Sequence, residues 1–306
     1  MRSIIKKAHT SLYIIRASIV CVAVLGLITG TIHNFYANAK TNPQQASIAA
    51  ATPAFPETDE ESPMERLDDE PDMELANYSS FPYFRENKIQ EYIDYKARSE
   101  DLTYQTVVTN VNIGLDKPYY FEIKTIIDPG SVSTLVNKYN MLPDDYIPDD
   151  LEKISGTDYL LRHQAREAFE NMRNDAKELG LNVFPVSTYR SYKYQKSIYD
   201  KRVAERGQAN VDRTSARPGH SEHQLGLAVD VIGTGKRVAD SEEYAWYSKN
   251  AHRYGFIIRY PEDKEHITGY SYEPWHLRYL GDGLAAAVYE SGLTYDEYYV
   301  RFLQPE

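Results

Sequence analysis

The stretch SEHQLGLAVD at residues 221–230, read with EPWH at residues 273–276, decides the architecture that this chain can adopt. In the first segment Gly226 and Ala228 alternate with larger apolar residues. Such alternation is typical of a buried strand, and the glycine indicates a turn where another group approaches the backbone closely. We therefore expect a turn that leads directly into a buried strand.

The two segments also contain the donors of a catalytic zinc site. Zinc binds neutral imidazole and carboxylate readily, and a catalytic site keeps three protein ligands so that water can occupy a fourth position. His223, Asp230 and His276 are the expected ligands, and the metal is expected to be the group that approaches the turn. Zinc lowers the pKa of its water from about 15.7 to near 7, so a base must still take up a proton. Glu273 is expected to be that base, in an extended or turn segment because Pro274 disfavours helical geometry before it.

The pattern Ser-x-His-x-x-Gly-x-Ala-x-Asp, followed by Glu-x-x-His, resembles the VanY-type D-alanyl-D-alanine carboxypeptidases, which are zinc peptidases that trim bacterial peptidoglycan stems. Two further segments carry the resemblance, STYRSYKYQ at residues 187–195 and GFIIRYP at residues 255–261. The similarity extends upstream and covers the chain from about Asn110 to Leu293. Thr188 departs from the pattern, because many relatives carry glycine before the Tyr-Arg pair.

The resemblance implies further site residues. Arg190 corresponds to the arginine of the family's Arg-Ser-x-x-x-Gln element and would stabilise negative charge on the tetrahedral intermediate. Gln195 and Ser221 are implied to orient the peptide through neutral hydrogen bonds. Among the 27 tyrosines, we expect Tyr260 or Tyr270 in the cleft, since an aromatic body with a polar tip suits a wet peptide-binding surface.

The function implied is removal of the C-terminal D-amino acid from peptidoglycan stem peptides. An L,D-carboxypeptidase or a peptidoglycan endopeptidase on the same metal site stays open, as does a noncatalytic wall-binding protein. Intact Glu273 speaks against the last, because a binding module needs no general base. His220 is interpreted as a neighbour of the ligands rather than a ligand, His266 is left open, and the remaining histidines are interpreted as structural or surface residues: His9, His33, His163 and His252.

Secondary-structure signals predict an α+β domain. Helices are expected at residues 84–97, 162–179, 191–206 and 242–254, and strands at residues 107–113 and 181–187. The resemblance implies a small antiparallel sheet with flanking helices, a hedgehog/DD-peptidase-like fold.

The N-terminal part of the chain indicates export. Residues 1–10 form a basic, cytoplasmic N-terminus, and the apolar residues 11–32 are a single-pass membrane anchor or a signal peptide that is cleaved near Ala39. Residues 33–80 are acidic and rich in proline, which predicts a disordered linker. Residues 81–306 are then the catalytic domain, expected to be monomeric and extracellular.

The composition argues against nucleic-acid binding and against cysteine chemistry. The formal net charge of −11 argues against a nucleic-acid partner, since binding a phosphate backbone requires a basic face. The single cysteine, Cys21, lies inside the apolar segment. The exported part therefore has no disulfides and no thiolate chemistry.

Overall fold

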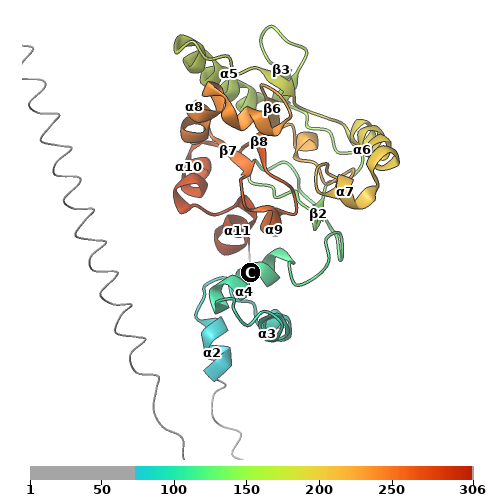
Figure 1. Cartoon of the computed structure of the whole chain (residues 1–306), viewed down its shortest axis with the longest axis vertical. Coiled ribbons are helices and arrows are strands. Elements are labelled where there is room, and N and C mark those ends of the chain that lie inside the picture. Colours follow the sequence, from blue (N-terminus) through green and yellow to red (C-terminus); the bar gives the residue numbers. More distant parts are fainter. Residues whose placement is uncertain (1–72, 305–306) are drawn as a thin grey trace, which may run out of the picture. The chain divides into compact units, whose positions relative to one another are not determined.

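The computed structural model describes residues 73–304 (Figure 1). The predicted basic N-terminus, the membrane segment and most of the predicted linker lie outside the described residues. Among the helices that are described, none is long and apolar enough to cross a bilayer.

A four-stranded antiparallel sheet carries both motif segments in its two central strands (Figure 1). The strands lie in the order β5 (Pro185–Ser187), β6 (Ala228–Val231), β8 (Glu273–Tyr279) and β7 (Phe256–Tyr260). All four residues of β6 are buried, as the sequence alternation predicts. In the register of β6 and β8, Asp230 lies opposite His276. The predicted small antiparallel sheet is confirmed, and it brings two of the predicted ligands together.

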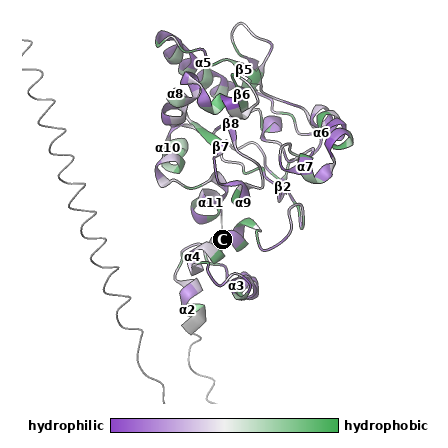
Figure 2. Cartoon of the chain, viewed as in Figure 1, coloured by the Kyte–Doolittle hydropathy of each residue, from purple (hydrophilic) through white to green (hydrophobic). Residues whose placement is uncertain are grey.

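Helix α5 (His163–Glu178) packs its apolar face onto this sheet. Its buried residues recur at helical spacing: Ala165, Phe169, Met172 and Ala176. The ring of Phe169 meets that of Phe256 on β7 edge-on, with centroids 6.2 Å apart. Burying a large apolar side chain contributes about 1.5–3 kcal/mol, so this face holds the helix against the sheet. Figure 2 shows that hydrophobic and hydrophilic residues are separated, with β7 green and much of the outer helices purple.

The other predicted helices of the catalytic region are confirmed. Helix α6 (Tyr192–Arg206) begins after Ser191, whose hydroxyl accepts a hydrogen bond from the backbone of Tyr194. Helix α8 (Glu242–Asn250) begins after Ser241 in the same way and continues as a 3₁₀ turn, Ala251–Tyr254. The strand predicted at residues 181–187 is shorter and begins only at Pro185.

Two predictions in the N-terminal third are wrong. Residues 107–113 form the end of helix α4 (Tyr104–Ile113), not a strand, because Thr103 caps its start and Gly114 ends it in a left-handed conformation. The last residues of the predicted linker form helix α2 (Met73–Ser79), in which Tyr78 is fully buried.

The helix predicted around residues 84–97 is confirmed as η1 (Glu86–Lys88) and α3 (Ile89–Ala97). Valine side chains of α4 pack on Tyr78 of α2 and Tyr92 of α3, so these helices share a small core of their own.

Short elements connect those above: β1 (Lys124–Thr125), β2 (Asn140–Met141), β3 (Leu151–Lys153), β4 (Leu160–Arg162), α7 (Gln208–Asp212), η2 (Glu222–Leu225), η3 (Lys236–Asp240) and α9 (Glu265–Thr268). Three further elements follow β8: α10 (Asp282–Ser291), α11 (Tyr295–Tyr298) and η5 (Tyr299–Leu303).

Candidate active site

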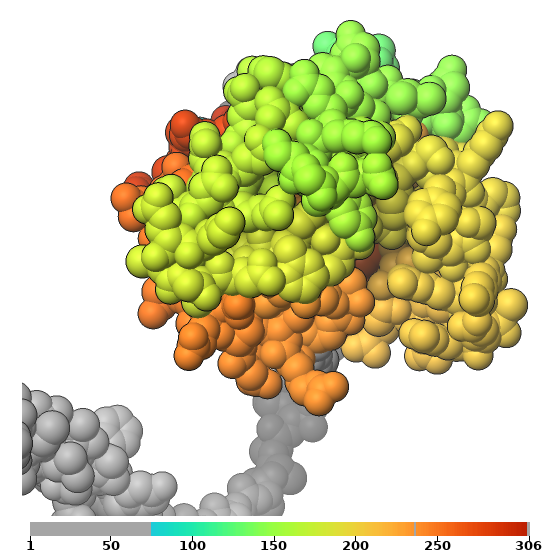
Figure 3. All heavy atoms as spheres, turned by 90° about the horizontal axis from the view of Figure 1, so that it is seen from above, coloured from blue at the N-terminus to red at the C-terminus, as the bar shows by residue number. Residues whose placement is uncertain are grey.

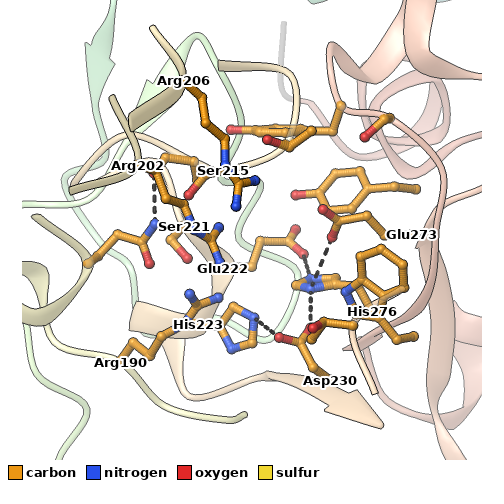
Figure 4. A pocket seen from close by; sticks show the side chains of 18 residues that line it. Arg190, Arg202, Arg206, Ser215, Ser221, Glu222, His223, Asp230, Glu273 and His276 are labelled. Carbon is orange, nitrogen blue, oxygen red and sulfur yellow. Dashed lines mark hydrogen bonds and ion pairs between the residues drawn. The ribbon is translucent and has the colours of Figure 1, made fainter. Parts of the chain in front are cut away.

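Three predicted ligands converge from three elements. His223 comes from the 3₁₀ turn η2, Asp230 from β6 and His276 from β8 (Figure 4). One potential donor atom from each residue lies within 4.8 Å of the others, and all three side chains are buried. A buried set of two imidazoles and one carboxylate matches the donors that a catalytic zinc site uses.

The turn before β6 requires glycine for its backbone conformation. Gly226 has a φ of +68°, which L side chains rarely adopt, and a Cβ built there lies 2.8 Å from Cδ2 of Leu151 and 3.0 Å from Cγ of Arg162. Side chains of β3 and β4 therefore approach this turn closely. The approach of a metal to the turn stays a prediction.

His223 presents one ring nitrogen to the centre. Its Nδ1 donates to the backbone carbonyl of Thr188 at 2.6 Å, which leaves a lone pair on Nε2. This Nε2 is buried, makes no hydrogen bond to any residue in 73–304, and lies 3.3 Å from Oδ2 of Asp230. Two electron-pair donors face each other there, and a cation between them satisfies both. Burial and the nearby charge of Arg190 lower the pKa of His223 to about 4, which keeps the ring neutral as a metal ligand must be.

His276 lies between two carboxylates. Its Nδ1 is 3.0 Å from Oδ1 of Asp230, and its Nε2 is 3.4 Å from Oε2 of Glu222. Burial alone lowers the pKa of His276, but the hydrogen bonds to the two carboxylates outweigh it and raise the pKa to about 9. Burial raises the pKa of Asp230, but its contacts with the two histidines, including the hydrogen bond from the charged His276, hold that pKa well below its usual range. His276 would hold a divalent cation through Nδ1 in place of the proton, and its Nε2–H would stay directed at Glu222.

Glu273 opens β8 beside these ligands. Its Oε2 lies 3.9 Å from Nδ1 of His276, and burial raises the pKa of its carboxyl to about 7. Glu273 is extended rather than helical, as Pro274 predicts. A carboxyl with a pKa near neutrality beside a metal-binding set has the properties of a general base.

Glu222 is a part of the site that the sequence interpretation missed. Its Oε1 accepts from Nε of Arg259 and from a terminal nitrogen of Arg278, both at 2.8 Å. Arg259 also donates to Asp296 at 2.6 Å. These charges are fully buried, and the two guanidinium groups hold the pKa of Glu222 well below its usual range although burial raises it. The sequence did contain a signal for this acid, namely one arginine inside each of the two largely apolar strands β7 and β8. A buried arginine requires a buried acidic partner.

The predicted peptide-contacting residues line one cavity of about 270 Å³ together with the three ligands and Glu273. Nε of Arg190 is buried without a hydrogen-bond partner in the described chain. Gln195 donates from Nε2 to the carbonyl of Ala216 at 2.7 Å, and its Oε1 is unpaired within the same residues. Ser221 lines the cavity, and the ring of Tyr260 lies 5.1 Å from that of His276. Tyr270, the alternative cleft residue, lines it as well. In Figure 3 the surface is hollowed where the gold segment around α6 meets the orange segment around α8.

The other histidines lie apart from the three ligands. Nδ1 of His220 lies 2.8 Å from the carbonyl of Asn137, and its ring packs edge-on against Tyr120. His163 is exposed and contacts Glu152, and the ring of His252 stacks on that of Tyr289. These three are not part of the metal-binding group found among residues 73–304.

Comparison with known proteins places the chain in a family. The family model described as VanY: D-alanyl-D-alanine carboxypeptidase matches residues 158–282. The Bacillus subtilis protein YodJ, whose name assigns it provisionally to the carboxypeptidases, is 39% identical over 212 residues, which are 62% of this chain and 77% of the relative. The chain therefore belongs to the VanY family of D-alanyl-D-alanine carboxypeptidases.

Two solved structures resemble this chain. The structure of the LdcB LD-carboxypeptidase is 38% identical, has a TM-score of 0.56, and matches 59% of this chain and 91% of that one. The structure of VanYB in complex with D-alanine-D-alanine is 37% identical, has a TM-score of 0.50, and matches 55% of this chain and 96% of that one.

Proposed function

We propose that this protein is a zinc-dependent D-alanyl-D-alanine carboxypeptidase that removes the C-terminal D-amino acid of peptidoglycan stem peptides. The observation that carries the proposal is the buried pairing of the unprotonated Nε2 of His223 with Oδ2 of Asp230, 3.3 Å apart, with Glu273 beside them. His276 completes the ligand set through Nδ1. Membership of the VanY family supports the same substrate class.

Each side chain of the site then has a separate role in the reaction. When bound, zinc lowers the pKa of a coordinated water to about 7 and polarises the peptide carbonyl. Glu273 accepts the proton of the attacking water and returns it to the leaving amine. Arg190 donates from its guanidinium, whose Nε is unpaired within residues 73–304, to the oxygen on which negative charge develops. Gln195 and Ser221, on the same cavity wall, orient the peptide backbone through hydrogen bonds, and Tyr260 packs beside the reacting group.

A second candidate is an L,D-carboxypeptidase, which acts on a terminal D-residue that follows an L-residue. The likeness to LdcB, an LD-carboxypeptidase with a TM-score of 0.56, favours it. The likeness to VanYB with D-alanine-D-alanine favours the D,D activity, as does the family model. The two activities use the same metal site and differ only in the residue before the scissile bond.

Defined stem peptides test the proposal. The zinc-loaded full-length chain is incubated with a pentapeptide that ends in D-Ala-D-Ala and with the matching tetrapeptide, and the released amino acid is identified. Release of D-alanine from the pentapeptide is the expected result. Release from the tetrapeptide alone indicates the L,D activity, and internal cleavage indicates an endopeptidase. No product from a chain that retains zinc indicates the noncatalytic wall-binding protein.

We also propose that residues 11–32 anchor the enzyme, with its catalytic domain outside the cell. Support comes from the basic residues that precede this apolar segment. Membrane fractionation and N-terminal sequencing of the mature chain distinguish an anchored protein from one that is cleaved near Ala39 and secreted.

A further inference from the structure

One wall of the cavity carries two arginines that the roles above do not use. Arg202 and Arg206 lie four residues apart on α6 and therefore share one face of the helix. Both line the cavity, and both side chains extend from α6 into it (Figure 4). Arg202 is half-buried, and Arg206 is exposed at the rim. With Arg190, three guanidinium groups face one cavity.

The carboxylates of the same cavity do not neutralise this pair. Glu222 is bound by Arg259 and Arg278, and Asp230 faces the two histidines. Glu273 lies beside His276 and is near enough to Arg202 to interact with its charge, but the two form no ion pair. Within residues 73–304, no ion pair within 4.0 Å joins Arg202 or Arg206 to an acid. Like charges at this helical spacing are destabilising, and here they occur in a chain of formal net charge −11. A pair of this kind that lines a cavity suits an anionic ligand.

A polar group without a partner lies on the same wall. The hydroxyl of Ser215 is buried and makes no hydrogen bond within the part of the chain that the structure describes. Ser215 lines the cavity together with both arginines (Figure 4). A hydroxyl and two planar forks of N–H donors match the acceptors of a carboxylate, which arginine binds in bidentate fashion.

We propose that Arg202 and Arg206 form a carboxylate-binding subsite that determines which peptides the cavity accepts. The inference rests on the proposed peptidase function and names its substrate class as peptides with a free acid group directed at α6. The carboxylate comes from an acidic side chain of the peptide or from its C-terminus. The pair acts mainly on specificity.

The test compares matched substrates and matched variants of the full-length chain. The variants are Arg202→Gln, Arg206→Gln and the double variant. Lys201→Gln is the control, because it removes one positive charge from the same helix at an exposed position that does not line the cavity. The substrates are a D-Ala-D-Ala peptide with a glutamate side chain, its glutamine counterpart, and a C-terminal amide of the first peptide.

The double variant is expected to raise KM for the acidic peptide about 10- to 100-fold, the size of one charge-assisted contact, with a much smaller effect on kcat. It is also expected to lose the preference of the wild-type chain for one acid over its amide. Loss of the side-chain preference assigns the subsite to an acidic residue, and loss of the C-terminal preference assigns it to the terminal carboxylate. A KM and a preference equal to those of Lys201→Gln would overturn the proposal.

Binding measured by calorimetry separates this proposal from the catalytic one. If the wild-type chain releases no amino acid, the proposed function fails. The subsite then still predicts tighter binding of the acidic peptide than of its amides, and loss of that difference in the double variant. Equal binding of all three peptides to the wild-type chain contradicts the subsite whatever the activity.

Discussion

Nδ1 of His223 donates to the backbone carbonyl of Thr188 across 2.6 Å. A backbone acceptor fixes the tautomer and the orientation of the ring, whichever side chain occupies position 188. The orientation of His223 therefore does not depend on the threonine at this position. The threonine side chain has a separate contact, because its Oγ1 accepts a hydrogen bond from the backbone N–H of Leu160 at 3.0 Å.

We predict that Thr188→Val lowers the stability of the protein without loss of metal. The substitution keeps the shape of the side chain and leaves the partly buried N–H of Leu160 without this partner, which costs about 1 kcal/mol. Denaturant unfolding measures the loss, and elemental analysis measures the metal. Thr188→Ser, which keeps the hydroxyl, serves as the control. Loss of zinc from Thr188→Val would show that the side chain, rather than the carbonyl, positions His223.

Replacing His223, Asp230 or His276 with alanine is expected to abolish metal retention together with activity. The wild-type chain is expected to bind about one equivalent of zinc, because the three residues complete one ligand set. Elemental analysis after gel filtration measures the occupancy. His163→Ala removes an exposed imidazole and should retain the metal. Full occupancy in any of the three variants removes that residue from the ligand set.

Glu273→Gln should separate chemistry from metal binding. Glutamine keeps the size of the side chain but accepts no proton, so kcat should fall about 100-fold or more while zinc content stays near that of the wild-type chain. Steady-state kinetics and elemental analysis of the same preparation check both parts. A variant that turns over at the wild-type rate would assign the base to another residue.

The sequence predicted the site better than its surroundings, for a physical reason. His223, Asp230, Glu273 and His276 lie in two short motifs whose chemistry is readable from residue type and spacing. The partners of Glu222 are 37 and 56 residues away, and only the pairing of β6, β8 and β7 brings them together. No local pattern contains that information.

The strand predicted at residues 107–113, where the structure has helix α4, is wrong for a related reason. Its residues 107–113 alternate well enough to indicate a strand, but Val107, Val108 and Val111 pack on Tyr78 and Tyr92 only in a helix. The cap at Thr103 and the left-handed Gly114 then fix its two ends. Tertiary packing and capping outweigh the β propensity of valine here.

Glu222→Gln is expected to destabilise the fold and weaken metal binding. The change removes the negative charge that Arg259 and Arg278 share, and leaving buried charges uncompensated costs about 3–5 kcal/mol. It also weakens the acceptor for Nε2–H of His276, which should lower zinc affinity about 10- to 100-fold. Chemical denaturation and competition with a chelator measure the two effects. Wild-type zinc affinity in a folded variant would show that Glu222 supports the fold alone.

Arg190→Lys tests how the guanidinium acts. Arg190 lines the cavity beside His223, and its Nε is buried without a partner in the described residues, so its donors are available to the substrate. If it stabilises the tetrahedral intermediate, lysine should lower kcat far more than it raises KM, because a point charge on a flexible stem does not reproduce the fixed fork of donors. If Arg190 binds ground state and transition state equally, KM should rise with kcat almost unchanged. We expect the first pattern, with zinc content and thermal stability close to those of the wild-type chain. The second pattern in steady-state kinetics would reassign Arg190 to substrate binding and leave stabilisation of the oxyanion to the metal alone.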